Sequence, residues 1–275
     1  MSVRPSQVSV PFPFADLDLA KRLEFTEGNG NACFIDARLR HNPAGGAARA
    51  TVGGALAMFD GPGSPLTQTF GLGIAEPATA AALDEIEHFF KSRRSDVFHE
   101  VSPMAGIDLA GTLATRGYRP IELSSVLYQP IDGWQARAVT PAVTVRAADE
   151  GEADLYARLA ARGWSESPEV QPFLEGLARL SLECATCFVA EIGGTPIAAG
   201  AVFLHEGVGL LAGASTVPEG RRQGAQLALL DARLQFAVAK GCDLAMMCAA
   251  PGSASQRNAE RNGFRIAYTR VKWQL

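Results

Sequence analysis

The pattern of apolar and polar residues in the second half of the chain predicts a strand, a tight basic loop and a helix in direct succession. An apolar run ends near Thr216, and an amphipathic segment extends from Leu227 to Val238. The loop between them, Val217–Gln226, has the sequence VPEGRRQGAQ. Its proline and glycines interrupt the strand, and apolar residues return at helical spacing after it.

The same periodicities predict further elements around this loop. Four strands and two helices are expected before it, and a strand and a short helix after it. Gly193-Gly194 is typical of a hairpin turn, and Asn262-Gly263-Phe264 follows the last helix. The expected strands are Val143–Arg146, Cys187–Glu191, Ile197–Leu204, Gly207–Thr216 and Cys242–Cys248, and the expected helices are Asp149–Arg162, Pro168–Leu182 and Ser253–Arg261.

The basic loop has the features of an anion site. The first N–H groups of a helix have no intrahelical partner, and the helix dipole is positive at that end. A glycine at this point, here Gly224, lets the main chain close on a diphosphate, and Arg221 and Arg222 stand beside it. The alternative is an ordinary solvated loop, because short Arg/Gly motifs arise without a ligand.

Taken together, these elements resemble the GNAT superfamily of acyl-CoA-dependent N-acetyltransferases. Its signature is a strand, Arg/Gln-x-x-Gly-x-Gly/Ala, a helix, a strand, a helix and Gly-Phe. Arg221, Gly224 and Gly263-Phe264 match, whereas Gln226 stands where the family usually has glycine or alanine. The resemblance covers roughly Val143–Leu275. It implies an α/β (α+β) fold with a mixed, mostly antiparallel twisted sheet flanked by helices.

The resemblance also implies acetyl-CoA as co-substrate. The pantetheine arm is then expected between two splayed strands, Leu210–Thr216 and Leu244–Cys248, and the diphosphate on the amides of Arg222 to Gln226. The cofactor-binding residues expected on this basis are Thr216, Val217, Arg222, Gln223, Gly224, Ala225, Gln226, Ser255 and Asn258.

The catalytic residues stay open. Many family members carry a tyrosine one turn before the Gly of Gly-Phe, where it protonates the departing thiolate, but this chain has Ala259 there. Asn258 can donate a hydrogen bond instead, and Tyr268 is a candidate acid by residue type. Candidate bases are Glu191, His205, Glu206 and Glu219, and a water chain is an alternative. The acceptor pocket is expected around Trp164, Ser165, Glu166 and Ser167.

The first half of the chain repeats the second in degenerate form. Leu113–Pro120 has the same pattern as Ala259–Ile266, and a strand at Thr69–Ala75, a helix at Ala78–Arg94 and a strand at Asp96–Val101 are expected before it. No glycine or arginine follows Pro77 at once, so we expect this half to have the fold without the cofactor. Two GNAT-like domains in tandem result: a degenerate one at 1–130, a linker at 131–142 and an N-acetyltransferase domain at 143–275.

Composition narrows the function further. Of 275 residues, 47% are hydrophobic and 20% charged, and the formal net charge is −4, which argues against a nucleic-acid partner. No apolar run approaches a membrane span and no export signal is visible, so a cytoplasmic location is expected. The five cysteines are expected to be reduced, and neither Cys184-x-x-Cys187 nor the four scattered histidines indicate a metal site. The oligomeric state stays undetermined.

The function expected from the sequence is the transfer of an acetyl group from acetyl-CoA to a primary amine of a small molecule or amino acid. The main alternative is a CoA-binding sensor or scaffold with weakened catalysis, because Ala259 replaces the usual tyrosine. A protein-interaction module without cofactor affinity is a third alternative.

Overall fold

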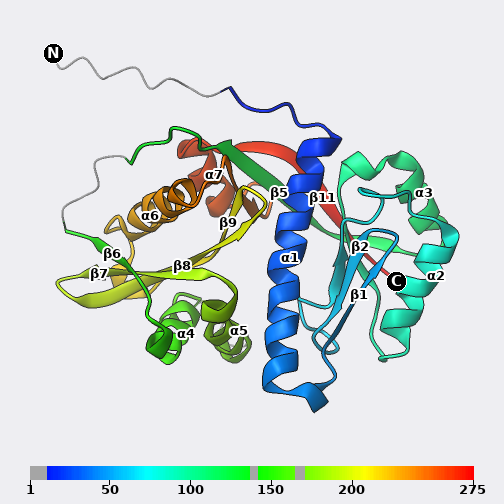
Figure 1. Cartoon of the computed structure of the whole chain (residues 1–275), viewed down its shortest axis with the longest axis horizontal. Helices are drawn as coiled ribbons and strands as arrows, with labels where there is room; N and C mark the ends of the chain where they lie inside the picture. The colour runs from blue at the N-terminus through cyan, green and yellow to red at the C-terminus, as the bar shows by residue number, and fades with distance from the viewer. Residues whose placement is uncertain (1–10, 137–141, 165–170) are drawn as a thin grey trace.

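A computed structural model of the chain describes residues 11–136, 142–164 and 171–275. These residues form one 11-stranded sheet that runs through both halves of the molecule in the order β1-β2-β3-β4-β11-β5-β10-β9-β8-β7-β6. Figure 1 shows β1 and β2 on the right, β6 to β9 on the left, and the long helix α1 between them.

The described elements agree with most of those expected from the sequence. The helices are α1 (Leu17–His41), α2 (Ala80–Lys91), α3 (Ile107–Thr115), α4 (Ala153–Arg162), α5 (Gln171–Cys184), α6 (Ala225–Ala239) and α7 (Ala254–Arg261). The strands are β1 (Ala48–Val52), β2 (Ala55–Phe59), β3 (Gln68–Phe70), β4 (Phe98–Val101), β5 (Arg119–Pro130), β6 (Thr144–Ala147), β7 (Thr186–Ile192), β8 (Thr195–His205), β9 (Val208–Thr216), β10 (Leu244–Ala249) and β11 (Arg265–Gln274).

The expected strand at Thr69–Ala75 is too long. Strand β3 ends at Phe70, and Gly71 and Gly73 then take positive φ angles of 76° and 74°, which turn the chain out of the sheet. The start of the expected helix Pro168–Leu182 and residues Ser165, Glu166 and Ser167 lie outside the described residues.

The sheet is mixed and mostly antiparallel, as expected. Among the described strands, the parallel pairs are β3 with β4 and β9 with β10, and all other neighbours are antiparallel. Each half therefore has one parallel pair. The two strands of each pair are joined through a connecting helix. The connecting helices are α2 in the first half and α6 in the second.

The two halves exchange a strand. Strand β11, at the end of the chain, lies between β4 and β5 of the first half, and β5 in turn lies between β11 and β10. Residues 271–274 of β11 pair with 98–101 of β4, and residues 244–249 of β10 pair with 125–130 of β5. The sheet is thus continuous, and each half is completed by a strand from the other.

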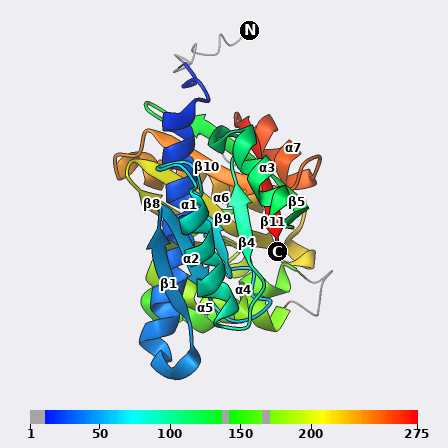
Figure 2. The same ribbon diagram turned by 90° about the vertical axis from the view of Figure 1, so that its right-hand side faces the viewer.

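Helices cover both faces of this sheet. On one face, α2 and α3 close a core around Leu83, Phe90 and Leu113. On the other face, α1 packs on the middle of the sheet through Leu19 and Leu23. Figure 2, turned by 90°, shows α1 and α2 running along the molecule at different depths.

Helix α1 was not predicted from the sequence, because it contacts both halves and its buried residues are spread around its circumference. Asp16 caps it by accepting a hydrogen bond from the Leu19 amide at 3.0 Å. Gly28 approaches Leu56 and Phe70 of the first half, whereas Gly30 approaches Phe203 and Leu210 of the second. Further contacts to the second half come from the pairs Arg22–Asp243, Asn29–His205, Arg40–Glu183 and His41–Glu183.

Within the described part of the chain, none of the helices combines the length and the apolar character that crossing a membrane requires.

Candidate active site

Strands β9 and β10 part from one another, as expected for a slot that admits an extended ligand. They pair only through Val208–Leu210 and Leu244–Met246. Beyond these residues the two described strands have no mutual pairing, and a cavity of about 470 Å³ opens where they separate. Its lining comes from both halves of the chain: Glu27 and Asn31 of α1 contribute to it together with residues of α4 to α7.

The basic loop leads from β9 into α6 with the backbone geometry of an anion site. Arg222 and Gly224 have φ angles of 62° and 87°, and Gly224 is the N-cap of α6. Among the residues that the structure describes, no side chain caps this helix start, so its first amide groups remain unpaired with a capping oxygen. Gln226 lines the cavity and donates a hydrogen bond to Thr216 Oγ1 at 2.7 Å. The side-chain amide of Gln226 therefore links the start of α6 to the end of β9.

Contacts from α4 hold the loop in place. Arg162 forms an ion pair with Glu219, and Arg221 donates a hydrogen bond to the Gly163 carbonyl at 3.3 Å. A Cβ at Gly163 would lie 2.3 Å from Ser215 Cβ and 3.0 Å from the Thr216 amide nitrogen, so glycine is required for this approach. Val217 is buried, whereas Arg222 and Gln223 are exposed beside the helix start.

A β-bulge shapes β9 next to the cavity. Ala199 pairs with Ser215 but Ala201 pairs with Ala212, so β9 has one extra residue in this interval, and Gly213 there has a φ of 62°. Arg233 of α6 is only 3% exposed and donates from Nη1 to the carbonyls of Ala201 and Ala212, at 3.3 and 3.5 Å. Burial lowers its pKa to about 10. The guanidinium thus satisfies carbonyl groups at the bulge.

Several of the residues named from the sequence come together at the cavity. Gln226, Ser255 and Asn258 line it, as does the buried Ala259. Trp164 is also in the lining and is 50% exposed. Within the described chain, Thr216, Val217, Arg222, Gln223, Gly224 and Ala225 do not line the cavity but form the strand end, loop and helix start beside it.

The bases considered from the sequence are absent from the described lining of the cavity. Glu191 is bound by Arg146 in the outer part of the sheet, with Nε and Oε1 2.9 Å apart. His205 ends strand β8, Glu206 lies in the turn that follows, and Glu219 is held by Arg162. Tyr268 is also outside the lining: its hydroxyl donates to Glu24 Oε1 at 2.8 Å, and burial raises its pKa well above the ordinary value.

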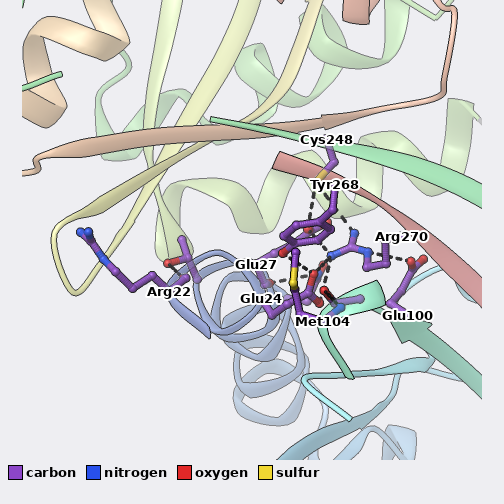
Figure 3. Close-up of polar contacts among 11 residues, drawn as sticks. Arg22, Glu24, Glu27, Glu100, Met104, Cys248, Tyr268 and Arg270 are labelled. Atoms are coloured by element: carbon purple, nitrogen blue, oxygen red, sulfur yellow. Dashed lines mark hydrogen bonds and ion pairs between the residues drawn. The ribbon is translucent and has the colours of Figure 1, made fainter. Parts of the chain in front are cut away.

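A buried cluster of charged residues lies at the α1 side of the cavity, and Figure 3 shows its side chains converging from α1, β4, β10 and β11. Arg270 is 2% exposed and contacts three carboxylates. Its Nη1 lies 2.9 Å from Glu27 Oε2 and 3.3 Å from Glu24 Oε1, and its Nε lies 2.9 Å from Glu100 Oε2. Cys248 donates from Sγ to Glu27 Oε2 at 3.0 Å.

The carboxylates of this cluster have different affinities for protons. Burial raises the pKa of Glu24 to about 7, against the opposing charge of Arg270. Burial also raises the pKa of Glu100. For Glu27 burial acts in the same direction, but the charge and hydrogen bond of Arg270 outweigh it and lower the pKa. Glu27 therefore stays ionised beside a glutamate that holds a proton near neutrality.

The sequence carried only a weak signal for this cluster. Tyr268, Arg270 and Lys272 alternate along a strand, and an alternating polar face is usually solvated. Because β11 is exchanged into the first half, this face meets α1 instead. Among the described residues, no group of three or more His, Cys, Asp or Glu side chains is arranged to hold a metal ion.

Comparison with known proteins gives the class of this fold and site. The family model of the acetyltransferase (GNAT) domain matches residues 135–251. The GCN5-related N-acetyltransferase from Kribbella flavida has a TM-score of 0.63 and 20% identity, with 87% of this chain and 93% of that chain covered. The tandem GNAT protein from the clavulanic acid biosynthesis pathway has a TM-score of 0.59 and 14% identity, with 96% of each chain covered.

A third structure, the GCN5-related N-acetyltransferase from Sphaerobacter thermophilus, has a TM-score of 0.54 and 15% identity over 87% of this chain and 84% of that chain. A search of curated proteins found no match. Residues 135–251 therefore match the GNAT acetyltransferase domain, and the chain as a whole has the tandem GNAT fold. This confirms the resemblance seen in the sequence.

Proposed function

We propose that this protein transfers the acetyl group of acetyl-CoA to a primary amine of a small molecule or amino acid, with the cofactor held by the C-terminal half. The diphosphate would rest on the first amides of α6, and the pantetheine arm would enter between β9 and β10. Thr216, Gln226, Ser255 and Asn258 offer hydrogen-bonding groups along that path.

The observation that carries this proposal is a difference between two equivalent helix starts. In the first half, Thr79 caps α2, and its hydroxyl accepts a hydrogen bond from the Ala82 amide at 3.2 Å. In the second half, Gly224 occupies the N-cap of α6 and offers no side-chain oxygen. The amides of α6 are therefore available to an anion, whereas one amide of α2 is already paired.

The chemistry also has support in the shape of the site. The thioester carbonyl becomes negative as the amine attacks, so fixed donors near the cavity lower the barrier. The bulge of β9 interrupts the strand ladder beside Ala212–Ala214, which line the cavity. Asn258 lines the cavity from α7, and its side-chain amide is the proposed donor to the cofactor sulfur.

The test is a calorimetric titration with acetyl-CoA, followed by thiol release over a panel of primary amines. Gly224→Leu should abolish acetyl-CoA binding. Gly241→Leu is the matched control, because Gly241 follows the other end of α6 and has a similar φ of 82°, and no described atom lies within 4 Å of the position that a Cβ would take there. Both changes strain the backbone to a similar degree, so equal loss of binding in both variants would contradict a phosphate role for the loop.

The alternative is a CoA-binding sensor or scaffold, favoured by Ala259 at the position of the usual tyrosine. It predicts binding of acetyl-CoA without transfer to any amine of the panel. Absence of acetyl-CoA binding in the unmodified protein would contradict both functions.

A further inference from the structure

Helix α1 brings an acidic side chain of the first half to the cavity of the second. Glu27 lines the cavity close to the end of β10, and Asn31 follows one helical turn later. Gly30, between them, lets the helix approach β8 and β9 closely, since its Cβ would lie 3.3 Å from Phe203 and Leu210 side chains. One wall of the cavity is thus formed by α1, which lies outside residues 135–251, the part of the chain that the family model matches.

We propose that Glu27 accepts the proton of the acceptor amine during acetyl transfer and passes it to the departing thiolate, so that the N-terminal half supplies the catalytic base. This inference rests on the proposed function. It assigns the degenerate half a part in the reaction, although that half binds no cofactor in our proposal.

The two oxygens of Glu27 are in different situations. Oε2 lies 2.9 Å from Arg270 Nη1 and accepts a hydrogen bond from Cys248 Sγ at 3.0 Å. Within the described ranges, Oε1 makes no hydrogen bond, and it is not among the buried unpaired atoms. Because the side chain keeps 16% of its surface exposed and lines the cavity, Oε1 is the oxygen offered to a ligand.

The carboxylate is fixed by a rigid partner. Arg270 is 2% exposed and is itself held by Glu24 and Glu100. Arg270 also keeps Glu27 ionised by lowering its pKa against the effect of burial. A base must be unprotonated and within reach of the proton it removes, and Glu27 is ionised at the cavity wall.

In this proposal Glu27 carries out both proton transfers of the reaction. A neutral amine attacks the thioester carbonyl carbon, the C–N bond forms, and the nitrogen becomes strongly acidic. Its proton passes to Glu27, so a carboxylate of lowered pKa is basic enough at that stage. The C–S bond then breaks, and Glu27 returns the proton to the thiolate, which leaves as CoA thiol. The net reaction consumes amine and acetyl-CoA and yields amide and CoA.

The cavity also indicates which amine to use as a probe. Apart from Glu27, Arg233 and a few amides, hydroxyls and thiols, its described wall is apolar, with contributions from Phe34, Trp164, Leu174 and Leu177. An amine with an apolar body fits this lining better than a polyamine does. Phenethylamine is therefore the first probe, and butylamine the second.

The experiment compares Glu27→Gln with the unmodified protein for acetyl-CoA affinity, kcat and the KM of phenethylamine. We expect kcat to fall about 100-fold to 10,000-fold, the range for loss of a general base, with little change in acetyl-CoA affinity. Asp18→Asn is the matched control, because Asp18 is an acid of the same helix with a 90% exposed side chain, and it should leave kcat unchanged. Glu27→Asp retains the charge that Arg270 needs and withdraws the oxygen from the cavity, so kcat should fall while the fold is kept.

Three results would overturn the inference. One is a kcat close to that of the unmodified protein in both Glu27 variants, and another is a rise in KM with kcat unchanged, which assigns Glu27 to binding. The third is an unmodified protein that binds acetyl-CoA but acetylates neither amine probe. Failure to bind acetyl-CoA at all contradicts the proposed function instead, so the two failures are distinguishable.

Discussion

Arg270 in the last strand and Glu24 in the first helix form an ion pair that excludes solvent. Nη1 of Arg270 lies 3.3 Å from both carboxylate oxygens of Glu24, and the two side chains are 2% and 0% exposed. Removing one member of a buried pair leaves the other charge uncompensated, which costs more than the pair itself contributes. The stability of the protein should therefore depend on Arg270, which compensates the buried carboxylates around it.

Arg270→Met should lower the free energy of unfolding by about 3–5 kcal/mol, because three carboxylates lose their common partner. Denaturant unfolding measures this change. Arg265→Met in the same strand is the control, because Arg265 is exposed and stacks on Phe12, and it should cost less than about 1 kcal/mol. Equal costs in the two variants would contradict a special role for the buried arginine.

Glu24 should make stability depend on pH between its ordinary pKa of 4.5 and the raised value of about 7. In this window the folded protein keeps the proton that the unfolded chain loses, so the glutamate contribution falls as pH rises, by up to about 1.4 kcal/mol per pH unit. Below pH 4.5 both states are protonated, and above pH 7 the full cost is present. Glu24→Gln does not titrate. Unfolding curves across this window should shift in favour of the glutamine variant as pH rises, and parallel curves would contradict the raised pKa.

Gly163→Ala should disturb the end of β9. Its Cβ would lie 2.3 Å from Ser215 Cβ and 3.0 Å from the Thr216 amide nitrogen, so the backbone must shift, at a cost of about 1–3 kcal/mol. Thermal unfolding and acetyl-CoA titration test both effects. Gly176→Ala in α5 has open space around the new methyl group and should be neutral or stabilising by up to about 1 kcal/mol. A Gly163→Ala variant of normal stability and affinity would show that this contact is not limiting.

One molecule of acetyl-CoA should bind per chain. The start of α2 is capped by Thr79, and no glycine or arginine stands there, whereas α6 starts at an uncapped Gly224. Isothermal titration measures the stoichiometry, and Gly224→Leu should remove all binding. A second equivalent of acetyl-CoA, or one that persists in Gly224→Leu, would place cofactor in the first half.

Asn258 and Tyr268 should differ in their effect on the reaction. Asn258→Ala should weaken acetyl-CoA binding about fivefold, the value of a hydrogen bond worth about 1 kcal/mol, because Asn258 lines the cavity. Tyr268→Phe should leave kcat almost unchanged and lower stability instead, because its hydroxyl pairs with Glu24 away from the lining. Arg257→Ala, exposed on the same helix as Asn258, is the control for the first variant. A large loss of kcat in Tyr268→Phe would restore Tyr268 as a candidate acid.

The sequence predicted most elements of the second half because each has a local cause. Gly193 and Gly194 make the hairpin between β7 and β8 through positive φ angles of 56° and 78°. Ser253 caps α7 by accepting a hydrogen bond from the Gln256 amide at 3.1 Å. Such signals act over a few residues, so they can be recognised without knowledge of the rest of the chain.

The side of the cavity formed by α1 could not be predicted in the same way. Glu27 lies 221 positions from Cys248, its hydrogen-bond donor, and the two meet only because α1 crosses both halves. The helix lacks a single apolar stripe, since it packs on each half through different sides. Its polar residues therefore have the pattern of a solvated segment, and pairing across such distances leaves no local trace in the sequence.

The exchanged strands have a consequence for how this protein is made. Strand β5 gains its neighbour β11 only after residues 265–274 have been synthesised, so the sheet of the N-terminal half cannot close before translation has reached these residues. Until then β4 and β5 offer unpaired edges to other nascent chains. Neither half is therefore a sensible unit for separate expression. A tag or truncation that disturbs β11 should first disturb the sheet of the N-terminal half, where β11 pairs with β4 and β5.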